Sequence, residues 1–67
     1  MKYEVRPVDP GKSWNIASDR EIIGTLERLA TGYLVRLSDP PKVVKRFRMI
    51  DALTEALGED AAIEVIE

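Results

Sequence analysis

The chain has 67 residues, a formal net charge of −2 and a hydrophobic fraction of 45%, which indicate one small folded domain over residues 1–67 rather than a disordered segment. It contains neither cysteine nor histidine, so disulfides, thiolate metal sites and catalytic Ser–His or Cys–His pairs are excluded. No apolar run approaches the roughly 20 residues that span a bilayer, and the first residues do not resemble a signal peptide, so a cytoplasmic protein is expected.

The first part of the chain predicts strands separated by polar turns. Alternating apolar and charged residues predict a strand over Lys2–Val8, with Tyr3 and Val5 inward. Pro7 lacks an amide donor, so this strand should be an edge or should end there. A turn with proline and glycine follows, and then a short second strand over Trp14–Ala17.

The clearest pattern is a hairpin over Ile22–Leu37. Its second strand alternates apolar and polar side chains, and Gly32 stands where a loop of three to five residues needs a positive φ. Gly24 lies inside the first strand and predicts a bulge or a sharp bend of the sheet.

Another short strand is expected over residues 42–47, after a loop with two consecutive prolines. Because side chains alternate along a strand, Val43 and Phe47 should fall on one side of it and Val44 on the other.

The hydrophobic period then changes to that of an amphipathic helix. Ile50, Leu53 and Leu57 recur at i, i+3 and i+7, and Gly58 stands at an expected left-handed C-cap. The tail beyond it fits either a last strand or a continuation of the helix after a kink. The β-branched residues within 62–66 favour the strand.

These elements predict an α+β fold. A small antiparallel meander of four to five strands should be covered on one face by a single helix in the C-terminal half, with a short last strand as the favoured final element. The expected core consists of apolar side chains from the strands and the helix: Trp14, Ile16, Ile23, Leu26, Tyr33, Val35, Leu37, Phe47, Ile50, Leu53 and Leu57.

The strand meander followed by residues 47–57 resembles two groups of small domains in its apolar spacing. One is the arm-type DNA-binding domain of tyrosine recombinases, and the other is the partially double-stranded-RNA-binding-like fold of HicB-type antitoxins. In both groups a sheet precedes a helix. The chain departs from both in its extra strand and its acidic tail, and no residue roles follow from the resemblance.

The chain offers few residues for catalysis or for holding a cofactor or metal ion. The Gly-Lys-Ser of residues 11–13 matches the end of a phosphate-binding loop, but Arg6 replaces the earlier glycine and a strand follows. Asp51 and Glu55 share a helix face, yet no spacing matches a calcium loop. We therefore expect no catalytic residue, no cofactor, no metal site and no enzymatic activity.

Basic side chains are the best candidates for a binding surface. All ten Lys and Arg residues lie within residues 1–48, whereas residues 49–67 carry only acidic charge. This asymmetry fits either a basic binding face beside an acidic tail or a surface whose charges compensate one another. The candidate binding surface consists of Arg28, Arg36, Lys42, Lys45, Arg46 and Arg48.

Two functions fit such a surface. A small sheet has edges that accept a strand from a partner, and residues 63–66 could pair with an edge in their own domain or in a second copy. The first hypothesis is therefore a protein-interaction or regulatory adaptor module, with a protein partner or self-association. The alternative is a nucleic-acid-binding domain using the basic sheet face, against which the negative net charge counts. Neither a membrane nor a small-molecule substrate is an expected partner.

Overall fold

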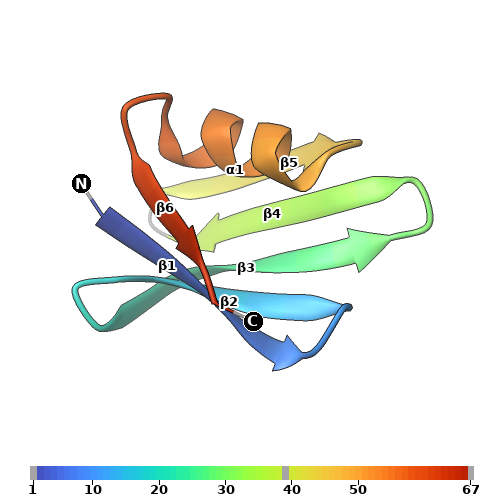
Figure 1. Ribbon diagram of the computed structural model, residues 1–67. Helices are drawn as coiled ribbons and strands as arrows, with labels where there is room; N and C mark the ends of the chain where they lie inside the picture. The colour runs from blue at the N-terminus through green and yellow to red at the C-terminus, as the bar shows by residue number, and fades with distance from the viewer. Residues whose placement is uncertain (1, 39, 67) are drawn as a thin grey trace.

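The computed structural model describes residues 2–38 and 40–66, which form one six-stranded sheet and one helix (Figure 1). The predicted α+β fold is confirmed, including the favoured last strand. The elements follow one another along the chain as β1 (Lys2–Asp9), β2 (Ser13–Ser18), β3 (Glu21–Leu29), β4 (Gly32–Ser38), β5 (Pro41–Arg46), α1 (Met49–Leu57) and β6 (Ala62–Val65).

The strands lie in the order β5-β4-β3-β2-β1-β6. The first five form an antiparallel meander, and β6 joins β1 in parallel, with Tyr3 opposite Ile63 and Val5 opposite Val65. The prediction that β1 is an edge or ends at Pro7 is therefore wrong. Pro7 lies beyond the residues that pair with β6, so its missing amide leaves no gap in that ladder.

Turn chemistry explains the hairpin connections. In the β1–β2 turn the Lys12 amide donates to the Asp9 carbonyl at 2.8 Å, and Gly11 has a φ of +81°, as a type II turn requires. Asp19 and Arg20 join β2 to β3 with φ values of +51° and +67°, the conformation of a type I′ turn. Each connection keeps its two strands adjacent.

The β3–β4 turn differs from the expected one. Leu29 pairs directly with Gly32, so the loop holds two residues rather than three to five. Gly32 has a φ of +140°, and a Cβ there would overlap the Arg46 carbonyl oxygen and lie 2.9 Å from the Phe47 Cα. Its positive φ was expected, but the close approach of the end of β5 was not.

The predicted bulge near Gly24 is confirmed. The register between β2 and β3 shifts after Ile16, so that Ile23 has no partner in that ladder. A Cβ on Gly24 would overlap the Arg36 carbonyl oxygen. Glycine therefore lets β4 approach the bulged strand closely.

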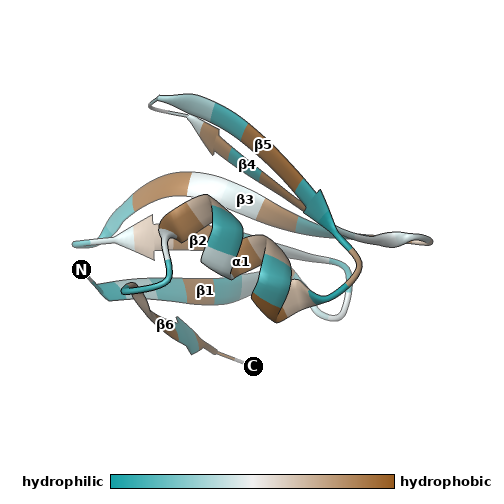
Figure 2. Ribbon diagram, turned by 90° about the horizontal axis from the view of Figure 1, so that it is seen from above, coloured by the Kyte–Doolittle hydropathy of each residue, from teal (hydrophilic) through white to brown (hydrophobic). Residues whose placement is uncertain are grey.

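The helix lies over one face of the sheet (Figure 2). Its closest backbone neighbours are β4 and β5. It ends at Leu57 and is capped by Gly58, whose amide donates to the Thr54 carbonyl at 2.8 Å. The φ of Gly58 is positive as expected, at +105°, but its ψ of 150° is extended and not that of a left-handed cap. The extended ψ turns the chain away from the helix, toward the start of β6.

The core lies between the helix and this face. Of the expected core residues, Trp14, Ile16, Leu26, Val35 and Leu53 are buried, and four others pack against them half-buried: Ile23, Tyr33, Leu37 and Leu57. The remaining buried core residues are Tyr3, Val5, Val44, Ala52 and Ala56. Val44 occupies the position on β5 that faces the helix.

Phe47 and Ile50 were expected in the core, and for both the expectation is wrong. Phe47 is 81% exposed and Ile50 is 50% exposed. Because Val44 faces the helix, Val43 falls on the open face of the sheet, where it is 66% exposed. Phe47 follows the end of β5 at the same parity as Val43 and does not return to the core.

Candidate functional site

Strand alternation divides the predicted basic surface between the two faces of β5. Lys42 and Arg46 lie on the helix side, like Val44 between them. The Lys42 Nζ donates to the Glu55 carbonyl at 3.2 Å, and the Arg46 guanidinium forms an ion pair with the Glu55 carboxylate. These two basic side chains therefore hold the helix against the edge of the sheet.

The other predicted binding residues lie in three further places. Arg36 and Lys45 are on the open face, opposite Val43 and Leu34 respectively. Arg28 is opposite Tyr33 on the helix side, at the end of the sheet where its amide donates to the Lys12 carbonyl at 2.7 Å. Arg48 follows β5 and precedes the helix. No single face of the sheet carries all six.

The junction between β5 and α1 contains several unfavourable local choices. Arg48 is the N-cap residue, with extended φ and ψ of −104° and 143°, and makes no side-chain capping bond. A cation at this position also opposes the helix dipole. Phe47 and Ile50 leave large apolar side chains in water on either side of it. Such conflicts between local and overall preference concentrate at functional sites.

We define the junction surface as the exposed open-face side chains in the middle of β5, together with the turn that follows it and the exposed apolar residue at the start of the helix. It combines two cations with three apolar residues and extends along the free edge of the sheet. Its members are Val43, Lys45, Phe47, Arg48 and Ile50. Aromatic, arginine and aliphatic side chains of this kind often anchor protein interfaces.

Val43, Phe47 and Ile50 were not among the predicted binding residues, yet the sequence holds a signal for Ile50. Met49, Ala52, Leu53 and Ala56 follow the spacing i, i+3, i+4 and i+7 of a buried helix stripe. That stripe places Ile50 outside it. The expected set of Ile50, Leu53 and Leu57 has larger side chains and therefore a stronger apolar signal. Two members of the buried stripe are alanines, which give a weaker one.

The opposite edge of the sheet has the opposite charge. Glu64 of β6 lies opposite Glu4 of β1, and the Glu4 carboxylate accepts a hydrogen bond from the Arg6 guanidinium at 3.2 Å. Within residues 2–38 and 40–66 Glu64 forms no ion pair. Two carboxylates directly opposite each other on neighbouring strands are destabilising.

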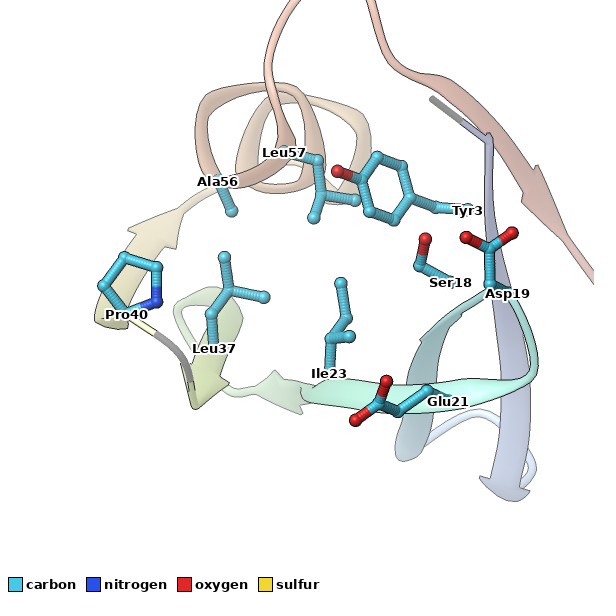
Figure 3. A pocket seen from close by; sticks show the side chains of 9 residues that line it. All are labelled: Tyr3, Ser18, Asp19, Glu21, Ile23, Leu37, Pro40, Ala56 and Leu57. Atoms are coloured by element: carbon cyan, nitrogen blue, oxygen red, sulfur yellow. The ribbon is translucent and has the colours of Figure 1, made fainter.

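A pocket of about 350 Å³ opens between the end of the helix and the β2–β3 turn (Figure 3). Tyr3, Ile23, Leu37 and Leu57 point toward one another across it. Ser18 and Asp19 lie at its rim, and its other lining residues are Glu21, Pro40 and Ala56. This volume is near the lower limit for small-molecule sites. None of the predicted binding residues lines this pocket.

The part of the chain that the structure describes contains no group of three or more side chains suited to a metal ion. No helix among the described residues is long and apolar enough to cross a membrane. Comparisons with protein-family models, with curated protein sequences and with solved structures find no match to this chain.

Proposed function

We propose that this chain is a non-enzymatic protein-interaction module that binds its partner through the junction surface and the free edge of β5. The observation that carries the proposal is Phe47, which is 81% exposed at the end of an edge strand. Covering such a side chain contributes about 2 kcal/mol to binding. Neither the core nor the helix of this chain uses Phe47, so its burial is left to a partner.

The free edge of β5 supports recognition by strand addition. β5 pairs with β4 on one side only, so its other side offers backbone amides and carbonyls to an extended segment. Val43 and Lys45 both lie on the open face of this edge and supply side-chain contacts there. The basic side chains favour a partner segment that carries acidic residues.

Nucleic-acid binding is the second candidate, because Phe47 stands between Arg46 and Arg48. An aromatic side chain between cations can stack on a base while its neighbours contact phosphates. Two features weigh against it: Glu55 already pairs with Arg46, and the chain has a net charge of −2. Labelled duplex, single strand and hairpin RNA at about 50 and 200 mM salt would reveal the steep salt dependence expected of phosphate contacts.

The proposal is tested by affinity capture from the host lysate, with three versions of the immobilised chain quantified side by side. Phe47→Ala removes the exposed ring, and Val8→Ala is the matched control because Val8 is 60% exposed on another strand. We expect proteins retained by the wild type and by Val8→Ala to be lost from Phe47→Ala. Equal retention by all three chains would show that the junction surface is not the contact.

A further inference from the structure

We propose that the partner of the β5 edge is a second copy of the chain, whose β6 pairs with β5 in parallel, head to tail. This inference rests on the proposed function, because it names the partner of the same surface. β5 and β6 are the two edges of the sheet, and they lie on opposite sides of the molecule in Figure 2. Each copy therefore presents one edge to each neighbour.

The strand directions permit this pairing. Successive antiparallel steps from β1 through β2, β3 and β4 bring β5 back to the direction of β1. β6 also runs parallel to β1. If a second copy extends the sheet in the same orientation, its β6 runs parallel to β5 and its helix lies on the same face.

The alternation of side chains then selects a register. On β6, Ile63 shares the helix side with Tyr3, so Glu64 lies on the open face. On β5, Val44 is on the helix side and Lys45 is on the open face. Placing Glu64 of one copy beside Lys45 of the next also places Ile63 beside Val44. An ion pair forms on one face and an apolar contact on the other.

The same register also brings exposed apolar residues at the ends of the two strands into contact. One step further along, Val65, which is 40% exposed, comes beside Arg46 of the next copy. Ile66, whose amide donates to the Val5 carbonyl at 2.8 Å, then comes alongside Phe47. The ring, which is 81% exposed within its own copy, thus gains an apolar neighbour.

Charge favours the pairing of β5 with β6 over the pairing of two β5 strands or of two β6 strands. Within residues 2–38 and 40–66, neither Lys45 nor Glu64 forms an ion pair. Pairing two β5 strands brings Lys42, Lys45 and Arg46 of both copies together, and pairing two β6 strands brings together Glu64 side chains that already face Glu4. Like charges at such a contact disfavour association. Only the β5–β6 contact joins opposite charges.

The contact is heterologous, so it leaves a free β5 at one end of every open assembly and a free β6 at the other. Its strands are short, with four residues in β6, and a contact of this size is weak. Sedimentation velocity from about 10 μM to about 1 mM is therefore the appropriate range. We expect the mean mass to rise continuously with concentration and to fall when salt is raised from about 50 to about 500 mM.

Charge reversal on either edge tests the contact. Glu64→Lys and Lys45→Glu should each weaken self-association at least about tenfold. An equimolar mixture of the two variants should restore self-association. Lys45 of the first variant meets Glu64 of the second, and the two substituted positions also bring a lysine beside a glutamate. Restoration in the mixture is a result that neither a folding defect nor a general charge effect produces.

The control variants separate the contact from folding and from net charge. Glu64→Lys replaces the repulsion with Glu4 by an attraction, so its melting temperature should not fall below that of the wild type. Glu59→Lys and Lys12→Glu make the same charge changes at exposed positions outside both edges. Both should associate as the wild type does.

Each outcome decides between the inference and the proposed function. A wild-type chain that remains monomeric to about 1 mM, or a mixture that fails to associate, overturns the inference. If the chain is monomeric but Phe47→Ala still loses captured proteins, the proposed function stands with a different partner. If association occurs and no other protein is captured, the second copy is the partner.

Discussion

Two glycines with positive φ show how differently the same backbone conformation can be constrained. Gly11 has a φ of +81°, and a Cβ built on it meets nothing within 4 Å. Gly32 has a φ of +140°, and a Cβ there meets the backbone at the end of β5. A flexible side chain could move aside freely, but a strand held in a sheet can move only by disturbing its hydrogen bonds.

Replacing these glycines by alanine should separate conformational strain from steric overlap. Gly11→Ala should lower the free energy of unfolding by about 1 kcal/mol, which is the cost of a left-handed L-residue alone. Gly32→Ala should lower it by about 3 kcal/mol, because the end of β5 must also shift. Urea denaturation monitored by Trp14 fluorescence measures both. Equal losses would indicate that the end of β5 yields without cost.

The β2–β3 turn holds strain that is not forced by packing. Asp19 and Arg20 both have positive φ values, yet neither is glycine, and Asn-Gly is the favoured pair for a type I′ turn. Replacing both residues, as Asp19→Asn with Arg20→Gly, should raise the free energy of unfolding by about 1 kcal/mol. Thermal unfolding gives the comparison. An unchanged melting temperature would mean that both native side chains make compensating contacts.

At the scale of elements, the local patterns predicted each strand and the helix, with shifts of a residue or two at their ends. What they could not predict was which side of β5 meets the helix. Both Val43 and Val44 are apolar; in the structure Val44 faces the helix, and Lys42 and Arg46 on the same side contact Glu55. Contacts between segments determined that choice, and with it the position of the predicted basic surface.

The pairing of β6 was also beyond local reasoning. Residues 62–66 indicated a strand, but the direction and partner of that strand depend on the path from Gly58 across the end of the sheet. β6 joins β1, which is far from it in sequence. For the same reason β1 lost the edge position that Pro7 had indicated.

Arg48, a member of the junction surface, makes the start of the helix less stable than an acidic N-cap residue would. Arg48→Asp should raise the free energy of unfolding by about 1 kcal/mol, because a carboxylate at the N-cap accepts a backbone hydrogen bond and suits the helix dipole. Arg48→Ala supplies neither interaction and should leave stability nearly unchanged. Chemical denaturation and partner binding should be measured on the same samples. A gain in stability with undiminished binding would remove Arg48 from the contact surface.

At the scale of the whole molecule, cooperativity should not be uniform across the sheet. β3 lies between two antiparallel neighbours, whereas β6 is an edge strand of four residues whose side chains are mostly exposed. Segments with few buried contacts open locally before the whole chain unfolds. β6 is therefore the element that can leave the sheet at the least cost.

Amide hydrogen exchange followed by NMR tests this order of opening. At low protein concentration, where copies are apart, the amides of β6 should exchange at least about tenfold faster than those of β3. The Ile66 amide, bonded to the Val5 carbonyl, should belong to the faster group. Equal protection in both strands would instead make β6 part of the cooperative core.

The parallel pairing of β1 with β6 also determines how the molecule resists a mechanical load. A force that draws residues 2 and 66 apart acts along two neighbouring parallel strands, so it shears their hydrogen bonds all at once. A force between Gly32 and Arg46, at the same end of the β4–β5 pair, would instead peel that pair apart one bond at a time. The domain should therefore resist a load between residues 2 and 66 better than one that unzips β5 from β4.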